Sequence, residues 1–344
     1  MYKLNTAVWE ITLKCNIHCL HCGSNANSKK RKCELTTEEA MDLVEQLADL
    51  GCERVVLSGG EPFLRKDWAV IAMRIKELGM MVSFISNGYL VDEDIVDLLN
   101  IIQPVGISFS LDGSCEETHD YIRGKKGVFK RCVNALNLTS KAGLYSSAVT
   151  SVHKKNLNEL PKILEILLDN AVCAWQIQTA TPQGRMPKEL ALNEDEYYQL
   201  ASFIAENKNK YKNLIRILEA DCIGYYSVMS EKLETKTWKG CHAGMSVIGI
   251  ESDGSIKGCL SLHGDDFIEG NIREKSLKEI WTSKENFKYN RRFSPDQLQG
   301  ICKDCKYGAI CRGGCSEKSL SFTGTRYGSP YCLYNYEKTR GIIL

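Results

Sequence analysis

The sequence lacks the features of a secreted protein, a membrane protein or a broadly basic protein. Its 44 basic and 43 acidic residues leave a net charge of +1, which argues against general binding to nucleic acid or to a membrane surface. No apolar run reaches the length of a membrane span, and Glu10 and Lys14 interrupt the region where a signal peptide would be apolar. We therefore predict a cytoplasmic protein that uses neither nucleic acid nor a membrane as a partner.

Low-complexity tracts and long linkers are also missing, whereas cysteine is abundant. The chain has 16 cysteines among 344 residues. A cytoplasmic chain keeps its thiols reduced, so a disulfide scaffold is not expected. We interpret clustered cysteines first as metal ligands.

The first 210 residues alternate between apolar stretches of strand length and helical patterns, which is typical of repeated strand and crossover-helix units. Thr36 and Glu39 form a capping box before the first helix, and Gly51 follows its end. Six units do not complete the eight of a full barrel, so we predict an α/β fold with a partial (β/α)6 TIM-like barrel. The expected strands cover residues 7–13, 54–58, 81–85, 105–111, 144–152 and 174–179.

The pattern changes beyond Pro187. A helix is expected over residues 194–208, and from Cys241 onward glycine and cysteine are dense and regular elements are short. Such a segment buries little apolar surface, so metal would be needed to stabilise it. We predict a barrel over residues 1–210, a bridging region over 211–240 and a small cysteine-rich domain over 241–344.

The first cysteine motif is C-x3-C-x2-C, formed by Cys15, Cys19 and Cys22 directly after the first expected strand. Three thiolates on one short loop can converge on one metal centre, but they complete neither a tetrahedral zinc site nor a four-iron cluster. A structural zinc site would recruit His18 or His21 as the fourth ligand. Zinc and iron–sulfur interpretations both remain open from these residues alone.

This motif on the loop after strand one resembles that of the radical S-adenosylmethionine (SAM) superfamily. The resemblance implies a [4Fe–4S] cluster with one iron left for the amino and carboxylate groups of SAM. Reduction of that cluster would cleave SAM to a 5′-deoxyadenosyl radical. The resemblance also implies cofactor contacts in the glycine-rich turn after strand two and after strand three, at Gly59, Gly60, Glu61, Pro62, Ser86 and Asn87.

Polar residues recur on the later strands. Period two places Ser108, Ser110 and Asp112 on one face of strand four. Because polar groups on a buried strand need partners, we expect a bound nucleoside and substrate to contact Ser110 and Asp112. Arg123 lies where the resemblance places an arginine near the cofactor carboxylate, and a solvated loop arginine is the alternative. We also expect Gln178 on strand six to point inward.

The C-terminal cysteines closely match the seven-cysteine pattern of the SPASM domain, C-x12-G-x4-C, then C-x2-C-x5-C-x3-C, then a last cysteine. The resemblance implies two auxiliary [4Fe–4S] clusters, three clusters in all, and a zinc ribbon is the alternative. The cluster nearer the active site would take Cys241, Cys259 and Cys315. The distal cluster would take Cys302, Cys305, Cys311 and Cys332.

This partition leaves the nearer cluster one ligand short. Its fourth iron would be open to substrate or closed by Cys222 or His242. Cys222 has a second possible role as a hydrogen-atom donor to a substrate radical, and a third as a small buried apolar residue. The last interpretation is preferred for the other unplaced cysteines, Cys33, Cys52, Cys115, Cys132 and Cys173.

The resemblance implies a peptide-modifying enzyme. We predict a maturase that abstracts a hydrogen atom from a short ribosomally made peptide and forms a crosslink, a thioether or another oxidised product. Sulfatase maturases share both cysteine patterns but carry a carboxylate directly after the G-x4-C cysteine, where this chain has Leu260. Only fourteen residues precede Cys15, so we expect a leader to bind a separate protein or the barrel surface.

Two other functions remain open. A radical enzyme of this kind could modify a small molecule, such as a tetrapyrrole or quinone precursor, and the chain could instead be a non-enzymatic zinc-binding protein. Either radical function needs a low-potential electron donor. We expect a flavodoxin or ferredoxin that docks near the distal cluster.

Overall fold

The computed structural model describes residues 2–27, 31, 33–220, 222–235 and 238–343. One curved ten-stranded sheet runs through it, in the order β10-β9-β8-β1-β2-β3-β4-β5-β6-β7. Strands β1 to β7 are parallel to one another, β8 is parallel to β1, and β9 and β10 are antiparallel additions. The strands are β1 Thr6–Glu10, β2 Arg54–Ser58, β3 Met81–Ser86, β4 Gly106–Ser110, β5 Ser146–Val152, β6 Ala174–Thr179, β7 Arg216–Glu219, β8 Val247–Ile250, β9 Ser255–Lys257 and β10 Gly270–Asn271.

The six expected strands and the partial barrel are confirmed, but the first strand ends at Glu10 rather than at residue 13. The side chain of Glu34 accepts hydrogen bonds from Thr12 Oγ1 at 2.8 Å and from Leu13 N at 2.9 Å. The second of these bonds occupies the backbone N–H of Leu13, which a longer strand would use for pairing. Strands four and five are also shorter than expected by one or two residues at an end.

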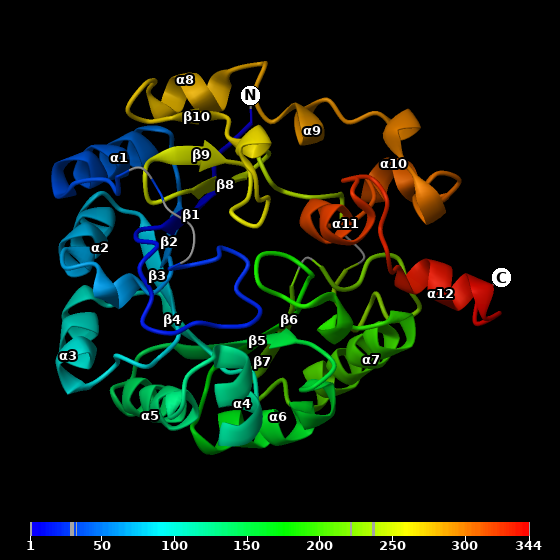
Figure 1. Cartoon of the computed structure of the whole chain (residues 1–344), viewed down its shortest axis with the longest axis horizontal. Coiled ribbons are helices and arrows are strands. Elements are labelled where there is room, and N and C mark those ends of the chain that lie inside the picture. Colours follow the sequence, from blue (N-terminus) through cyan, green and yellow to red (C-terminus); the bar gives the residue numbers. More distant parts are fainter. Residues whose placement is uncertain (1, 28–30, 32, 221, 236–237, 344) are drawn as a thin grey trace.

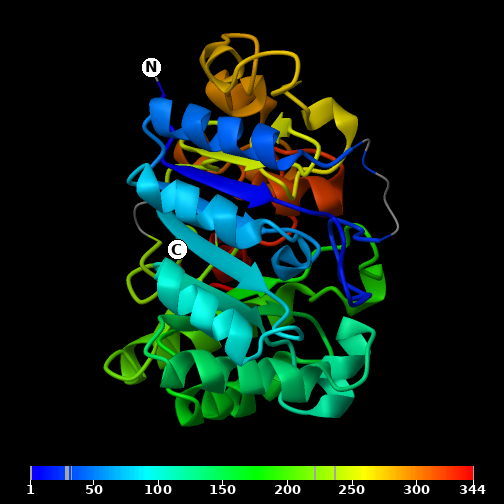
Figure 2. The ribbon, with the colours of Figure 1, turned by 90° about the vertical axis from the view of Figure 1, so that its left-hand side faces the viewer.

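Helices cover the outer face of the barrel sheet, and Figure 1 shows them around its rim. Figure 2 shows α1, α2 and α3 side by side in front of the parallel strands. The Thr36–Glu39 capping box of α1 is present. The barrel helices are α1 Thr37–Asp49, α2 Trp68–Glu77, α3 Glu93–Ile102, α4 Glu116–Arg123, α5 Val128–Lys141, α6 Leu160–Asp169 and α7 Glu194–Lys210.

The sheet continues beyond the six expected strands in both directions. Strand β7 lies in the bridging region and pairs with β6, while β8 pairs with β1 in a register that opposes Thr6 to Val247. The C-terminal region is therefore hydrogen-bonded to the barrel edge. The domain limits at 210 and 240 stay a prediction, since the sheet crosses both.

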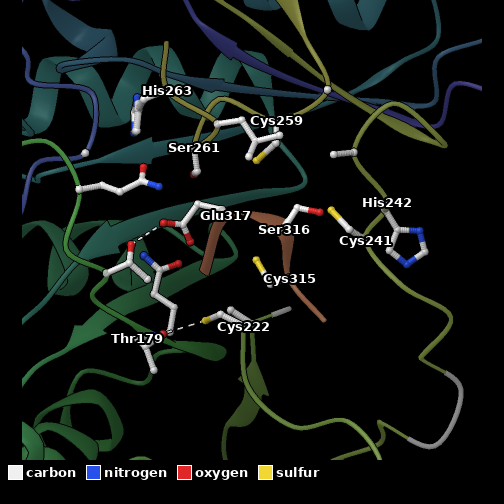
Figure 3. A pocket seen from close by; sticks show the side chains of 18 of the residues that line it. Thr179, Cys222, Cys241, His242, Cys259, Ser261, His263, Cys315, Ser316 and Glu317 are labelled. Atoms are coloured by element: carbon white, nitrogen blue, oxygen red, sulfur yellow. Dashed lines mark hydrogen bonds between the residues drawn. The ribbon is translucent and has the colours of Figure 1, made fainter. Parts of the chain in front are cut away.

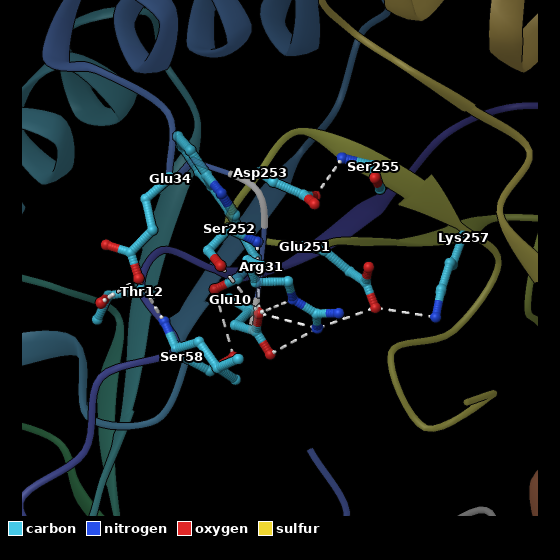
Figure 4. Close-up of polar contacts among 12 residues, drawn as sticks. Glu10, Thr12, Arg31, Glu34, Ser58, Glu251, Ser252, Asp253, Ser255 and Lys257 are labelled. Atoms are coloured by element: carbon cyan, nitrogen blue, oxygen red, sulfur yellow. Dashed lines mark hydrogen bonds and ion pairs between the residues drawn. The ribbon is translucent and has the colours of Figure 1, made fainter. Parts of the chain in front are cut away.

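A buried charge network crosses this junction (Figure 4). Arg31 Nη2 lies 3.1 Å from Glu10 on β1 and 3.0 Å from Glu251 after β8. Lys257 on β9, which is fully buried, lies 2.8 Å from the same Glu251 carboxylate. The network joins the segment that carries the first cysteines to the C-terminal hairpin.

The C-terminal region otherwise consists of short helices and loops, on the side that the barrel leaves open (Figure 1). None of the helices in the described part of the chain combines the length and apolar character needed to cross a membrane. The short helices are α8 Leu277–Thr282, α9 Lys288–Arg291, α10 Gly308–Cys311, α11 Ser316–Thr323 and α12 Leu333–Thr339.

Candidate active site

Cys15, Cys19 and Cys22 lie together on the segment that follows β1, and they pack against a small apolar cluster that contains Ile17 and Val128. This segment has no regular secondary structure, so side chains from elsewhere must hold its backbone. The three thiols of the motif are brought to one place, as the motif predicts. Their role as cluster ligands stays a prediction.

Three polar side chains that the sequence analysis missed hold this cysteine loop. Asn27 forms two hydrogen bonds with the backbone of Cys15, at 3.0 and 2.7 Å. Lys125 Nζ donates to the carbonyl of Asn16 at 3.0 Å, and Arg185 Nε donates to the carbonyl of Cys19 at 2.9 Å. No motif marks these residues, because their partners are backbone groups of the loop, at least 12 residues away in sequence.

Two glycines approach the same loop so closely that a side chain would not fit. A Cβ on Gly60 would lie 2.2 Å from the carbonyl oxygen of Lys14, and a Cβ on Gly124 would lie 2.2 Å from that of His18. Gly124 also has a φ of 66°, a conformation that favours glycine. The glycine-rich turn after β2 therefore has a packing role here, beside the expected cofactor contact.

Glu61, Ser86 and Asn87 meet at the carboxyl ends of β2 and β3. The buried Glu61 carboxylate accepts hydrogen bonds from Ser86 Oγ at 2.8 Å and from Asn87 N at 2.9 Å. Asn87 Nδ2 also lies 3.9 Å from Cys15 Sγ. Burial raises the pKa of Glu61 to about 7, against the hydrogen bonds that favour its charged form. The predicted SAM contacts thus adjoin the predicted cluster ligands.

Asp112 and Arg123 form a buried ion pair beside the cysteine loop. Arg123 Nη2 lies 2.5 Å and His21 Nε2 lies 2.8 Å from Asp112 Oδ2, and Arg123 Nη1 lies 3.7 Å from Cys19 Sγ. Burial alone would raise the pKa of Asp112, but Arg123 and His21 hold it below its usual range. The solvated-loop interpretation of Arg123 is wrong, because this side chain is buried.

We expected a bound ligand to supply hydrogen-bond partners to the polar residues of β4 and β6, but the protein itself supplies several of them. Ser108 Oγ lies 2.7 Å from Ser147 Oγ, and Asp112 Oδ1 accepts from Ser151 N at 2.8 Å in addition to its ion pair. Gln178 Nε2 donates to Ser151 Oγ at 2.9 Å. Our argument that these polar residues need a ligand is therefore wrong for Ser108 and Asp112. Cofactor contacts at Ser110 and Asp112 stay predictions.

A cavity of about 330 Å³ lies between the cysteine loop, the ends of β5 and β6 and the C-terminal region. We call it the substrate cavity. The thiols of Cys241, Cys259 and Cys315 face it together with Cys222 and Glu317, as Figure 3 shows. His21, His242, His263 and Gln178 also line it. Gln178 thus lies in the substrate cavity, apart from the Glu61 region.

Glu317 gives this cavity a carboxylate that the sequence analysis missed. It projects from α11, its Oε1 accepts hydrogen bonds from Thr181 at 2.5 Å and from Ser321 at 2.8 Å, and burial raises its pKa. The cavity therefore contains an acidic group, even though Leu260 stands directly after the G-x4-C cysteine. The position of Glu317, two residues after Cys315, could not be connected to the cavity without the fold.

A second cavity of about 190 Å³ lies further from the barrel. Four cysteines line it, and a set of four thiols suits a four-iron cluster. We call it the distal cavity. The structure thus separates the seven C-terminal cysteines into the same groups of three and four that the resemblance to the SPASM domain implies. The four are Cys302, Cys305, Cys311 and Cys332.

No three His, Cys, Asp or Glu side chains within the described residues are spaced to hold a single metal ion. A four-iron cluster takes each thiolate at a different iron, so its ligands need not converge on one point. Cys222 is buried, and Thr179 N donates a hydrogen bond to its sulfur at 3.4 Å. Cys33 and Cys115 are exposed, so the buried apolar interpretation is wrong for these two.

Comparison with known proteins decides between the remaining interpretations. Residues 9–167 match the family model of the radical SAM superfamily, and residues 241–306 match the SPASM iron–sulfur cluster-binding domain. The chain is 31% identical to an AdoMet-dependent heme synthase of Methanosarcina barkeri, over 95% of both chains.

The chain belongs to the radical SAM superfamily.

Other proteins that are similar to this radical SAM enzyme are named for different activities. An Fe-coproporphyrin III synthase of Methanosarcina barkeri is 27% identical over 98% of this chain and 89% of its own. The mycofactocin maturase of Mycolicibacterium smegmatis is 27% identical over 94% and 80%. The structure of SuiB of Streptococcus suis bound to S-adenosylmethionine aligns with a TM-score of 0.77 at 16% identity, over 95% and 76%, and confirms the fold.

Family membership establishes the class of cofactor. The radical SAM enzyme uses SAM and a [4Fe–4S] cluster, and its SPASM domain binds auxiliary iron–sulfur clusters. The thiols of the cysteine loop and of the two cavities are chemically suited to these groups. The alternative of a non-enzymatic zinc-binding protein is wrong.

Proposed function

We propose that this radical SAM/SPASM enzyme modifies a side chain of an iron tetrapyrrole. The heme synthase relative supports this proposal, since it is similar over 95% of both chains. The observation that carries the proposal is the substrate cavity, because three of the six histidines of the chain line it. Imidazole is the commonest protein ligand of a metal and is a frequent axial ligand of heme iron.

His242 is exposed and can offer its ring to a ligand in the cavity, whereas His21 is enclosed by the protein. Its Nε2 is fixed by Asp112 at 2.8 Å, and its Nδ1 is buried without a hydrogen-bond partner among the described residues. The same residue lies beside Cys22 in the cysteine motif. His21 therefore links the place where a radical would be generated to the place where a tetrapyrrole would bind.

The assignment of cofactors to residues belongs to this proposal. Cys15, Cys19 and Cys22 would hold the SAM-binding cluster. When bound and reduced, that cluster would supply the electron that cleaves SAM to a hydrogen-abstracting radical. Glu61 and Asn87 position SAM beside Cys15. The distal cavity and the substrate cavity each hold one auxiliary cluster, for three in all, and Cys222 is a candidate for the missing fourth ligand.

The residues around these sites hold the cysteine loop in place and set the charge beside it. Arg123, fixed by Asp112, places a positive charge beside Cys19. Arg185 and Lys125 keep the cysteine loop on the sheet. A flavodoxin or ferredoxin supplies electrons from outside and docks near the distal cavity.

A binding experiment tests the tetrapyrrole proposal before any turnover. Iron coproporphyrin III is titrated into the cluster-loaded enzyme and followed by its absorption band, with metal-free coproporphyrin III as the matched control. Tighter binding of the iron form is expected, by tenfold or more, because only that form gains an imidazole ligand. Failure of the iron form to bind would overturn the proposal.

A peptide substrate is the second candidate, favoured by the mycofactocin maturase relative. A peptide substrate would need a separate protein that binds its leader. Co-expression of the enzyme with short peptides encoded beside its gene, followed by mass spectrometry, distinguishes it. A peptide mass loss that depends on Cys19 would favour this candidate over the tetrapyrrole.

A further inference from the structure

Lys318 is a fully buried lysine between the two C-terminal cavities. It projects from α11, three residues after Cys315, and its exposed fraction is 1%. Burying an ammonium group without a counter-charge is costly. A negative group is therefore expected near it.

The hydrogen bonds of Lys318 identify its charge state from geometry. Its Nζ donates to the carbonyl of Cys222 at 2.9 Å, to the hydroxyl of Tyr197 at 3.2 Å and to the carbonyl of Tyr331 at 3.3 Å. Tyr197 donates its own hydroxyl proton to the Cys222 carbonyl at 3.0 Å, so it accepts from Lys318. Three acceptors match the three donors of an ammonium group.

Among the residues that the structure describes, no carboxylate lies within ion-pair distance of Lys318. The adjacent Glu317 interacts with Lys318 only at longer range, and burial raises the pKa of Glu317 itself. Lys257, which is as deeply buried, shows the usual solution, because it lies 2.8 Å from the Glu251 carboxylate. Two lysines with the same burial thus differ in one respect. Lys318 is held by three neutral acceptors and by the face of the Tyr197 ring, whose centroid lies 4.3 Å from Nζ.

The position of Lys318 indicates where its counter-charge lies. Cys222 faces the substrate cavity, and Tyr331 directly precedes Cys332 of the distal cavity. The ammonium group therefore bonds to the backbone of Cys222 on one side and to the backbone next to Cys332 on the other.

We propose that Lys318 is a fixed positive charge shared by the two auxiliary clusters, and that it raises the reduction potential of both. Each auxiliary cluster gains one electron, and one negative charge, when a low-potential donor reduces it. A buried cation between them stabilises that added charge, in surroundings where screening by water is weak. Lys318 acts on the clusters through its charge and does not touch the reacting atoms. This inference rests on the proposed assignment of the two cavities to auxiliary clusters.

The test is a potentiometric titration of the cluster-loaded enzyme with dithionite, followed by electron paramagnetic resonance. In K318Q, which loses the charge but keeps amide donors, the auxiliary signals are expected to shift to lower potential. The signal of the cluster on Cys15, Cys19 and Cys22 should stay in place and serves as an internal control. K318R keeps the charge and should restore the wild-type potentials.

Y197F is the matched control for the hydrogen-bond network, since it removes one acceptor of Lys318 and leaves the charge. Its auxiliary potentials should stay near those of the wild type. If K318Q fails to retain iron, K318M repeats the loss of charge with an apolar side chain of similar length. Unchanged auxiliary potentials in an iron-replete neutral variant would overturn the proposal.

Iron analysis separates this proposal from the one it rests on. A wild-type enzyme with about twelve irons per chain, as three four-iron clusters require, supports the assignment of the cavities. About four irons per chain would overturn that assignment and the role of Lys318 with it. Unchanged potentials at full iron content would overturn the role of Lys318 alone.

Discussion

The cysteine loop of the barrel and the cysteines of the C-terminal region lie in opposite electrostatic surroundings. Beside Cys19, the buried Arg123 is neutralised by Asp112 at 2.5 Å. Beside the two C-terminal cavities, the buried Lys318 has only neutral hydrogen-bond acceptors among the described residues. The barrel site thus pairs its buried cation directly with a carboxylate, whereas none of the described carboxylates, Glu317 included, forms an ion pair with Lys318.

The two regions also differ in how their backbones are held. The cysteine loop is fixed to a regular sheet by Asn27, Lys125 and Arg185. The C-terminal cysteines lie among helices of four to eight residues, which bury little apolar surface. We expect loss of a barrel cysteine to stop chemistry without unfolding, and loss of a C-terminal cysteine to affect the fold as well.

The largest expected effect is that of C19A, which should abolish SAM cleavage. The thiolate is a ligand of the cluster that supplies the electron, and neither remaining thiol replaces it. Release of 5′-deoxyadenosine under dithionite measures the effect, with C33A as the matched control because Cys33 is exposed and outside both sites. Cleavage by C19A at the rate of C33A would contradict the assignment.

Next in size is C311A, which should lose about four irons per chain and lower the melting temperature, while part of the SAM cleavage remains. Cys311 is one of the four thiols of the distal cavity, so its loss should remove a whole cluster. Iron analysis and thermal unfolding measure this, with C115A, an exposed cysteine, as the control. Unchanged turnover and iron content in C311A would argue against an auxiliary cluster there.

D112N tests the charge balance of the barrel site. It leaves the buried Arg123 uncompensated, which should lower the free energy of unfolding by roughly 3–5 kcal/mol. The pKa of Asp112 is lowered in the fold, so its stabilising effect is present above the unfolded pKa of about 3.9 and is lost as the pH falls below it. Chemical denaturation measures the loss. The control is E45Q, which breaks the exposed Glu45–Arg74 pair and should leave the free energy of unfolding unchanged. If D112N lowered the free energy of unfolding as little as E45Q, the contrast between the two regions would be lost.

The smallest effect concerns Glu61. Burial raises its pKa from 4.5 to about 7, so the folded protein holds a proton that the unfolded chain releases. The free energy of unfolding therefore falls by roughly 3 kcal/mol as the pH rises from about 4.5 to about 7. E61Q should flatten this loss, as measured by denaturation of the SAM-free, cluster-loaded enzyme at about pH 5 and about pH 7.5. An equal pH dependence in both proteins would show that Glu61 is charged throughout.

Local patterns in the sequence predict much of the fold. Apolar periodicity located the six strands, and Thr36 with Glu39 marked the start of α1. The strand β7 was missed because four residues, Arg216–Glu219, carry too little periodicity. The end of β1 was misplaced because Glu34, far along the loop, binds the backbone at Leu13.

Cysteine spacing predicts that Cys15, Cys19 and Cys22 are brought together, because that motif lies on one short segment. The grouping of the C-terminal cysteines, which are spread over residues 241–332, came from the resemblance to the SPASM domain. Neither predicts the residues that surround the thiols. Arg185, Glu317 and Lys318 reach their partners only through the packing of α11 and the cysteine loop onto the barrel. The polar face of β4 was misinterpreted for the same reason, since Arg123 comes from the end of α4 to meet Asp112.

The most direct test of the proposed function is turnover of an iron tetrapyrrole. The reduced, cluster-loaded enzyme is incubated anaerobically with SAM and iron coproporphyrin III, and both products are analysed by mass spectrometry. We predict a new iron tetrapyrrole of lower mass, formed together with 5′-deoxyadenosine and absent with C19A. Formation of 5′-deoxyadenosine with an unchanged tetrapyrrole would contradict the account.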